Sequence, residues 1–144
     1  MIITKNKRAY FDYNILETCE AGIVLRGFEV KSVKLGHISL KGSYVTIKSN
    51  EAFLLNAHIS AYQPKNMPQN YDPTRTRKLL LKRSEIKILI GKTASQGLTI
   101  VPLSVYTKKG KIKVQIGLAK SKTKRDKRET IKKRIAQREM NMGM

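Results

Sequence analysis

Side chains that could carry out catalysis are few in this sequence, and their spacing matches no familiar active site. The chain of 144 residues contains one cysteine, Cys19, and two histidines, His37 and His58. No pair of these has metal-site spacing, and Cys19 has no neighbouring histidine to activate it as a nucleophile. The ten acidic residues are scattered, whereas a two-metal nuclease needs clustered carboxylates. We therefore expect a binding protein with no catalytic residues, no metal site and no cofactor.

Basic side chains are the abundant chemical groups. Thirty lysines and arginines against ten acidic residues give a formal net charge of +20, which favours a polyanionic partner. One basic cluster, Lys5–Arg8, lies beside Tyr10 and Phe11, and another spans residues 75–83. Lysine and arginine neutralise phosphates, and neighbouring aromatic rings stack on unpaired bases. The sequence therefore predicts nucleic-acid binding, and RNA is favoured because no helix-turn-helix, zinc-finger or basic-zipper pattern is present.

The sequence favours a cytoplasmic protein with no membrane partner. Its purely apolar runs, such as Leu79–Leu81 and Ile88–Ile90, are only three or four residues long, far fewer than the about 20 that cross a bilayer. The first residues, Met1–Lys5, do not resemble a secretory signal. A single cysteine forms no internal disulfide, which fits a reducing compartment. We also expect the protein to be a monomer.

Short strands are the main elements expected to position these side chains. The clearest is a hairpin, in which Ile112, Val114, Ile116 and Leu118 alternate with polar or small residues. Its first strand is expected over 98–107 and its turn over 108–111. Further strands are expected over 10–16, 20–25, 43–47 and 52–59, with a turn over 48–51.

Helices and loops complete the expected body. A short helix fits 28–35, and Ser84 is a candidate N-cap for a second one ending at Gly91. Residues 61–76 contain Pro64, Pro68 and Pro73 and are expected to form a long exposed loop. With no repeating strand–helix units, we predict a mainly β protein with two or three short helices, either a sandwich or, preferably, an antiparallel barrel of five or six strands.

The composition changes near residue 119, so we predict a body over 1–118 and a tail over 119–144. The tail has six lysines and four arginines against three acidic residues, a net charge of +7, and no aromatic residue. Too little apolar surface is present to order it alone, so it is expected to be disordered when free. Asp126 and Glu129 nevertheless resemble a capping box, and Ile131 and Ile135 share a helical face. A partner should therefore make the tail helical.

Several residue strings, in one consistent order between residues 6 and 132, resemble the SsrA-binding protein family, small protein B. They are Asn6-Lys7-Arg8-Ala9, Glu20–Leu25, Gly27–Ser32, Ser43-Tyr44-Val45, Asp72–Leu81, Val101-Pro102-Leu103 and Asp126-Lys127-Arg128. The resemblance implies an oligonucleotide-binding (OB-like) barrel whose partner is the tRNA-like domain of transfer-messenger RNA. It further implies a non-catalytic adaptor for trans-translation: the protein imitates an anticodon arm, delivers the RNA to a stalled ribosome, and places its tail in the empty mRNA channel.

The resemblance also implies two groups of site residues. The RNA face comprises Asn6, Lys7, Arg8, Glu20, Gly22, Glu29, Lys31, Arg75, Arg77, Lys78 and Leu80. The ribosome-contacting tail comprises Lys124, Asp126, Lys127, Arg128, Ile131, Lys132, Lys133 and Arg134.

Structural roles are the alternative for several of these residues. Glu20 fits an internal salt bridge, because a carboxylate is repelled by phosphates, and Gly22 fits a turn. Leu80 belongs to a leucine run of the kind usually found in a core, and the tail charges fit nonspecific attraction. Two positions depart from the family pattern: Ser121 replaces a usual glycine, which leaves the hinge to the tail open, and Phe11 replaces a histidine found in many relatives.

Two other functions fit the composition. A generic OB-type RNA chaperone or a ribosomal protein would explain the charge and the fold but not the particular strings. An RNA hydrolase is the third candidate, but the sequence contains no recognisable acid–base pair to support it.

Overall fold

The computed structural model describes residues 1–62 and 70–141. Pro64 and Pro68 of the expected loop lie outside the described residues. Strands and helices follow one another as β1 (Ile2–Lys5), α1 (Lys7–Asp12), β2 (Tyr13–Ile23), α2 (Gly27–Lys34), β3 (Ile38–Ser39), β4 (Tyr44–Lys48), β5 (Glu51–Leu55), β6 (His58–Ile59), β7 (Arg77–Leu80), α3 (Arg83–Gln96), β8 (Thr99–Lys108), β9 (Lys111–Ser121) and α4 (Lys124–Asn141).

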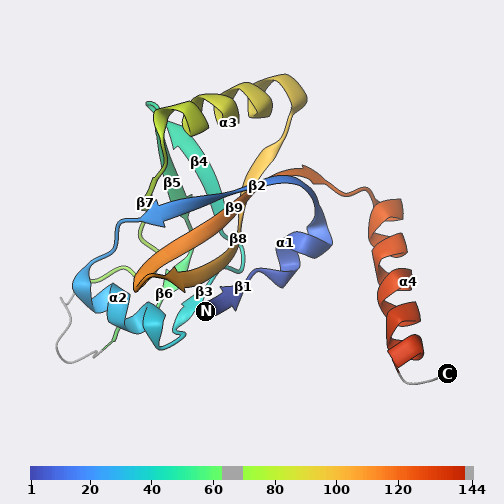
Figure 1. The fold of residues 1–144 in the computed structure, drawn as a ribbon, viewed down its shortest axis with the longest axis horizontal. Helices are drawn as coiled ribbons and strands as arrows, with labels where there is room; N and C mark the ends of the chain where they lie inside the picture. Colours follow the sequence, from blue (N-terminus) through green and yellow to red (C-terminus); the bar gives the residue numbers. More distant parts are fainter. Residues whose placement is uncertain (63–69, 142–144) are drawn as a thin grey trace.

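Antiparallel pairings close six strands into a ring. The order is β8-β4-β5-β7-β2-β9, and β9 pairs with β8 again, so the sheet returns to its starting strand. Strand β1 adds to one end of β8, and β3 pairs with β6 in a separate two-stranded sheet. Helix α3 covers one end of the ring, α2 lies towards the other, and α4 projects from the body (Figure 1). This arrangement confirms the mainly β antiparallel fold and is compatible with an OB-like barrel.

The hydrophobic core lies inside this ring. Val114, Ile116 and Leu118 of β9 are buried, as the predicted alternation requires. Gly117 and Ala119, expected on the wet face, are buried too, because Ala119 packs in a second core cluster with Ala9 of α1 and two residues of β8. Val33 of α2 and Leu89 of α3 belong to the same core cluster, so the two helices cover the open ends of the barrel. Burial of apolar surface from sheet and helices together stabilises the body.

Helix α1 differs from the strand expected over 10–16. The Asn6 side chain caps this helix, since its Oδ1 accepts from the Ala9 N–H at 3.3 Å. Its Nδ2 also donates to the Pro102 carbonyl at 2.9 Å, which ties the cap to β8. Capping and the burial of Ala9 override the strand preference of Tyr10 and Phe11, and β2 begins only at Tyr13.

Helix α3 is longer than expected and begins two residues earlier, with Lys82 rather than Ser84 at the N-cap position. Its first helical residue is Arg83, so Ser84 is not the N-cap; the Glu85 carboxylate accepts from the Lys82 N–H at 3.0 Å instead. The helix continues through Gly91, where an added Cβ would meet nothing within 4 Å. It ends at Gly97, whose φ of 63° is readily adopted by glycine. The helix expected within 28–35 is confirmed as α2.

The tail begins with strand rather than helix. Strand β9 runs to Ser121, beyond the expected boundary at 118, and α4 follows. The capping box expected at Asp126 and Glu129 is formed instead by Thr123 and Asp126. Thr123 N–H donates to Asp126 Oδ2 at 3.0 Å, and Asp126 N–H donates to Thr123 Oγ1 at 3.2 Å. No residue of α4 is buried. An isolated helix of this kind is only marginally stable in water.

Candidate nucleic-acid interface

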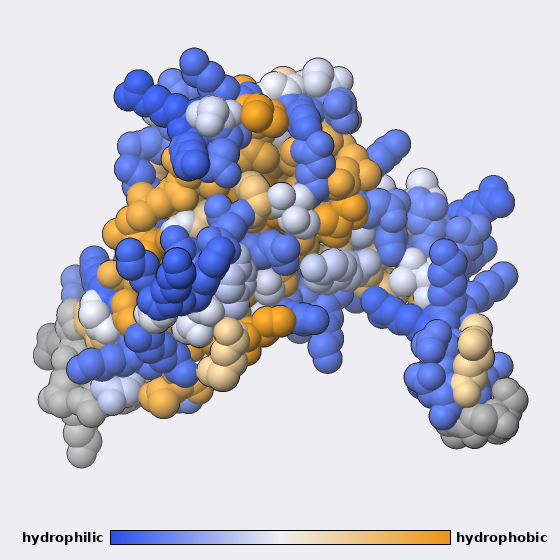
Figure 2. All heavy atoms as spheres, in the orientation of Figure 1, coloured by the Kyte–Doolittle hydropathy of each residue, from blue (hydrophilic) through white to orange (hydrophobic). Residues whose placement is uncertain are grey.

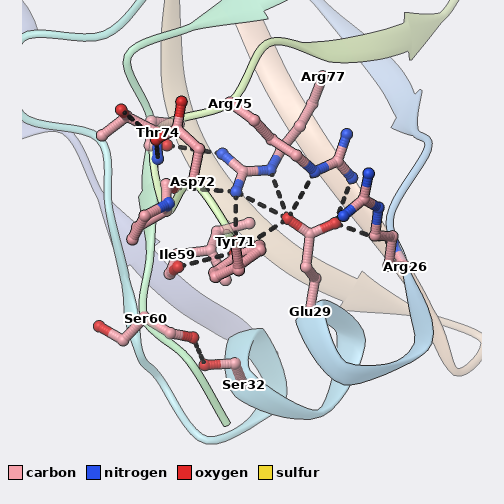
Figure 3. A network of polar contacts seen from close by, with 12 residues as sticks. Arg26, Glu29, Ser32, Ile59, Ser60, Tyr71, Asp72, Thr74, Arg75 and Arg77 are labelled. Carbon is pink, nitrogen blue, oxygen red and sulfur yellow. Dashed lines mark hydrogen bonds and ion pairs between the residues drawn. The ribbon is translucent and has the colours of Figure 1, made fainter. Parts of the chain in front are cut away.

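The buried carboxylate of Glu29 joins helix α2 to residues 71–77, which are more than 40 positions away in the sequence (Figure 3). Arg77 is also fully buried and donates to Glu29 Oε2 from Nε at 2.9 Å and from Nη2 at 2.7 Å. Arg75 contacts both carboxylate oxygens, and the Tyr71 hydroxyl donates to Oε2 at 3.1 Å. Helix α2 is thereby fixed against β7 and the turn that precedes it.

Hydrogen bonds keep Glu29 ionised in this buried position. Burial alone raises the pKa of a carboxyl group, but hydrogen bonds from Arg75, the Arg26 backbone and Arg77 outweigh it. Together they lower the pKa of Glu29 from 4.5 to about 2. Arg77 also donates to the carbonyls of Ala57 at 2.7 Å and Pro73 at 2.9 Å. The N–H groups of the Arg77 guanidinium therefore have hydrogen-bond acceptors inside the protein, as a buried ion pair requires.

Burial changes the role that Glu29 and Arg77 can have in RNA binding. A direct contact requires exposed surface, and neither side chain has any. Arg75 keeps 23% of its side chain exposed, so it can reach a partner while it contacts Glu29. The structure thus gives Glu29 and Arg77 a positioning role, and it identifies Tyr71, which the sequence did not single out, as a third member of the network.

Gly22 and Leu80 form the clearest surface feature among the predicted RNA-face residues. They are opposite each other in the β2–β7 pairing, and a Cβ added to Gly22 would lie 3.2 Å from Leu80 Cβ. Leu79 is buried, whereas Leu80 is 52% exposed. Both residues line a groove of about 390 Å³, together with Lys111 and Lys113 of β9. We call it the Leu80 groove; its apolar wall and two cations suit a nucleic-acid strand.

Glu20 lies two residues before Gly22 on β2, and its partners fit the internal salt bridge considered above. The Tyr106 hydroxyl donates to Glu20 Oε2 at 2.5 Å, and Lys108 Nζ lies 3.6 Å from the same oxygen. The hydrogen bond from Tyr106 is the main cause that lowers the pKa of Glu20. Burial, followed by Glu20, raises the pKa of Tyr106 to about 12. Glu20 is therefore an ionised acceptor held at the surface.

The other predicted RNA-face residues are divided between structural and exposed positions. Asn6 is 7% exposed and caps α1, so most of its hydrogen-bonding capacity is used internally. Lys7 begins α1 and is exposed. Lys31 Nζ lies 5.6 Å from the ring centre of Tyr62, and Lys78 Nζ lies 3.1 Å from Glu51 Oε1. These exposed cations are available to phosphates, although they are spread over several elements.

Helix α4 contacts the body at α1. Lys127 Nζ lies 3.3 Å from Asp12 Oδ1, and Arg8 Nε lies 3.0 Å from Asp12 Oδ2. The Phe11 ring has Arg8, Lys127 and Arg134 within 5.8 Å of its centre. Phe11 thus contacts cations of both α1 and the tail helix. The remaining predicted tail cations and Ile131 are exposed: Lys124, Arg128, Ile131, Lys132 and Lys133.

Groups suited to other chemistry are sparse in the described ranges. Burial, then Glu85 and Glu17, raises the pKa of the Cys19 thiol, which disfavours the nucleophilic thiolate. Residues 1–62 and 70–141 contain no group of three or more His, Cys, Asp or Glu side chains placed to hold a metal ion. No helix within these ranges is both long and apolar enough to span a membrane.

Comparison with known proteins decides the family. A sequence model of the SmpB protein family matches residues 3–144. The chain belongs to the SmpB family. Two curated relatives show how much of the chain is shared. The SsrA-binding protein of Gloeothece citriformis (strain PCC 7424) is 52% identical over 143 residues, which cover 99% of this chain and 92% of the relative. That of Geobacillus kaustophilus (strain HTA426) is 53% identical over 139 residues, covering 96% and 89%.

A solved structure extends the comparison to three dimensions. It is described as "tmRNA-SmpB: a journey to the center of the bacterial ribosome" and matches this SmpB-family chain with a TM-score of 0.68 and 43% sequence identity. The match covers 89% of this chain and 93% of the other. In this SmpB-family chain, hydrophilic side chains cover much of the face drawn in Figure 2, with apolar surface exposed below α3. Such mixed surface is suited to a partner that presents both phosphates and bases.

Proposed function

We propose that this chain is a non-catalytic RNA-binding adaptor of the cytoplasm. It binds the tRNA-like domain of transfer-messenger RNA and delivers that RNA to stalled ribosomes for trans-translation. The observation that carries the proposal is the identity of about half of all residues with SsrA-binding proteins over nearly the whole chain. The structural match to a protein described as part of a tmRNA-SmpB assembly supports the same partner.

The body supplies the RNA face in this proposal. Lys7, Arg8, Lys31, Arg75 and Lys78 contact phosphates, because their side chains reach the surface. Leu80 and Gly22 contact the RNA within the Leu80 groove, and Glu20 accepts hydrogen bonds from bases or hydroxyls. Asn6, Glu29 and Arg77 act from inside the protein by holding α1, α2 and the turn before β7 in place.

The tail supplies the ribosome contact. Helix α4 buries no residue of its own, so its order depends on the few contacts at α1 or on a partner. We propose that the tail is largely disordered in the free protein and becomes helical in the empty mRNA channel, where its cations face ribosomal RNA. The protein itself imitates the missing anticodon arm and acts as a monomer.

A reconstituted translation reaction tests the proposal. Ribosomes stalled on a truncated message are mixed with aminoacylated transfer-messenger RNA, with and without this protein, and addition of the peptide tag is measured. We expect tagging only when the protein is present. Normal tagging without it, or no tagging with it, would contradict the adaptor function.

A further inference from the structure

A second groove, which Leu80 also lines, lies between the β4–β5 turn and the start of α3. Its volume is about 550 Å³. Ala52 and Leu79, both buried, and Ile86 of α3 provide an apolar floor. Ser49 and Asn50 of the turn line the groove, as do Arg83, Ile86 and Lys87 from the first two turns of α3. We call this feature the α3 groove.

The rim of the α3 groove is predominantly basic. Lys78, Arg83 and Lys87 line it, and Glu51 is the one acidic residue among its lining residues. Glu51 lies 3.1 Å from Lys78 and so neutralises that cation in part. Arg83 and Lys87 are exposed, and neither has a salt bridge within the described ranges. Two cations are therefore left to attract an anionic partner.

The α3 groove and the Leu80 groove share one lining side chain, that of Leu80. This side chain is 52% exposed. A strand that lies against Leu80 therefore has cations of both grooves nearby: Lys111 and Lys113 in one groove, Arg83 and Lys87 in the other. An RNA backbone carries phosphates at the regular intervals that such a path requires.

We propose that the α3 groove binds the phosphate backbone of the RNA that occupies the Leu80 groove, with Arg83 and Lys87 as the contacting residues. This inference rests on the proposed function, since transfer-messenger RNA is then the partner. The apolar floor accommodates sugar or base edges, while Glu51 weakens the attraction by holding Lys78. The RNA footprint thus reaches the first turn of α3, outside the residue strings that resemble the family.

Charge removal on the rim tests the inference. The double variant Arg83→Gln/Lys87→Gln is compared with Lys41→Gln/Lys120→Gln, which removes the same charge from exposed positions outside both grooves. Dissociation constants for the tRNA-like domain are measured from low to high salt. Each phosphate contact contributes about 0.7 to 0.9 to the slope of log K against log salt. We expect the slope of the groove variant to fall by about 1.4 to 1.8 relative to wild type, and by clearly less in the control. Equal slopes in the two variants would overturn the proposal.

A second variant is expected to increase RNA affinity, a result that a loss of folding could not produce. Glu51→Gln removes the acid from the rim and frees Lys78, so RNA affinity should rise by about twofold at low salt. Glu139→Gln in the tail helix removes the same charge far along the chain and should leave affinity for the isolated tRNA-like domain unchanged. An unchanged or weakened affinity in Glu51→Gln counts against the groove. Tagging by wild-type protein tests the adaptor function separately, so the two failures are distinguishable.

Discussion

Among single residues, Glu20 and Glu29 have structural roles that the net charge of the protein does not reveal. Glu29 is placed among Arg75, Arg77 and Tyr71, and its carboxylate has no exposed surface. Glu20 is held at the surface by Tyr106 and Lys108. Both carboxylates stay ionised because hydrogen-bond donors surround them. The acids therefore orient the basic groups, and the excess of cations remains available to the RNA.

The Glu29 network predicts a loss of stability in acid. Because the pKa of Glu29 is lowered from 4.5 to about 2, its ionised form favours the folded state. Its contribution is complete above pH 4.5 and is lost as the pH falls towards 2; it amounts to on the order of 3 kcal/mol. The measurement is urea unfolding from pH 7 to pH 2.5. Glu29→Gln should lack this pH-dependent component and be destabilised by about 3 to 5 kcal/mol, because Arg77 is left unpaired. A parallel pH dependence in both proteins would contradict this assignment.

Leu80 should contribute to RNA binding and little to folding. Because its side chain is half exposed, Leu80→Ala should change the free energy of unfolding by no more than about 1 kcal/mol. Affinity for the tRNA-like domain should fall several-fold, since the apolar side chain that lines both grooves is lost. Leu16→Ala is the matched control. Leu16 is 54% exposed and lies on β2, the strand that pairs with β7, but it lines neither groove. Equal losses of affinity in the two variants would remove Leu80 from the RNA face.

The sequence suggested candidate site residues but could not divide them between surface and interior. Leu80 belongs to a run of three leucines, and only the strand register shows that Leu79 points inward and Leu80 outward. Arg77 and Glu29 are 48 residues apart, so no local pattern could reveal that they neutralise each other. Arg83 and Lys87 gained a candidate role only when folding placed α3 beside the β4–β5 turn.

At the scale of elements, local signals predicted the hairpin well and the helices less well. The alternation in β9 and the glycine turn before it specify a strand pair without help from distant residues. Helix α1 has only six residues, too few to be stable alone, and depends on the Asn6 cap and on packing of Ala9 against β8. The end of α3 depends on Gly97, and Gly91 is accommodated because it faces open space. Tertiary contacts and capping thus determined where α1 and α3 begin and end, which local sequence propensity did not predict.

The cap of α1 can be tested directly. Asn6→Ala removes both the acceptor for the Ala9 N–H and the donor to the Pro102 carbonyl. Loss of a capping residue together with a buried hydrogen bond should cost about 2 kcal/mol in unfolding free energy. Amide hydrogen exchange should increase in α1 while β9 remains protected. Lys7→Ala, on the exposed side of the same helix, should leave both measurements nearly unchanged. Uniformly faster exchange in Asn6→Ala would contradict a local role.

The whole molecule combines a closed barrel with a tail helix, α4, in which no residue is buried. The proposed RNA face is mainly on the barrel, whereas the tail leaves the barrel after β9 (Figure 1). Lys127 of the tail contacts Phe11 and Asp12 of α1. Strand β9 pairs with β2 as far as Ser121, so the barrel needs residues beyond 118. Binding and ribosome contact are therefore assigned to parts of the chain that can be separated.

Removal of the tail should separate the two activities. A chain ending after Lys122 keeps all of β9 and loses α4. It should bind the tRNA-like domain within about twofold of the full-length protein at moderate salt, because its lost charges lie outside the RNA face. Tagging on stalled ribosomes should be abolished, as measured in the reconstituted reaction. Normal tagging by the shortened chain would show that the tail is dispensable.

In the proposed function, the basic surface recognises the shape of one RNA rather than negative charge in general. Competition binding separates these two possibilities: protein bound to labelled tRNA-like domain is challenged with unlabelled tRNA-like domain, ordinary tRNA or unstructured RNA at physiological salt. We predict that only the tRNA-like domain displaces the label at near-stoichiometric concentrations, and that the other RNAs require a large excess. Equal displacement by all three would contradict the claim.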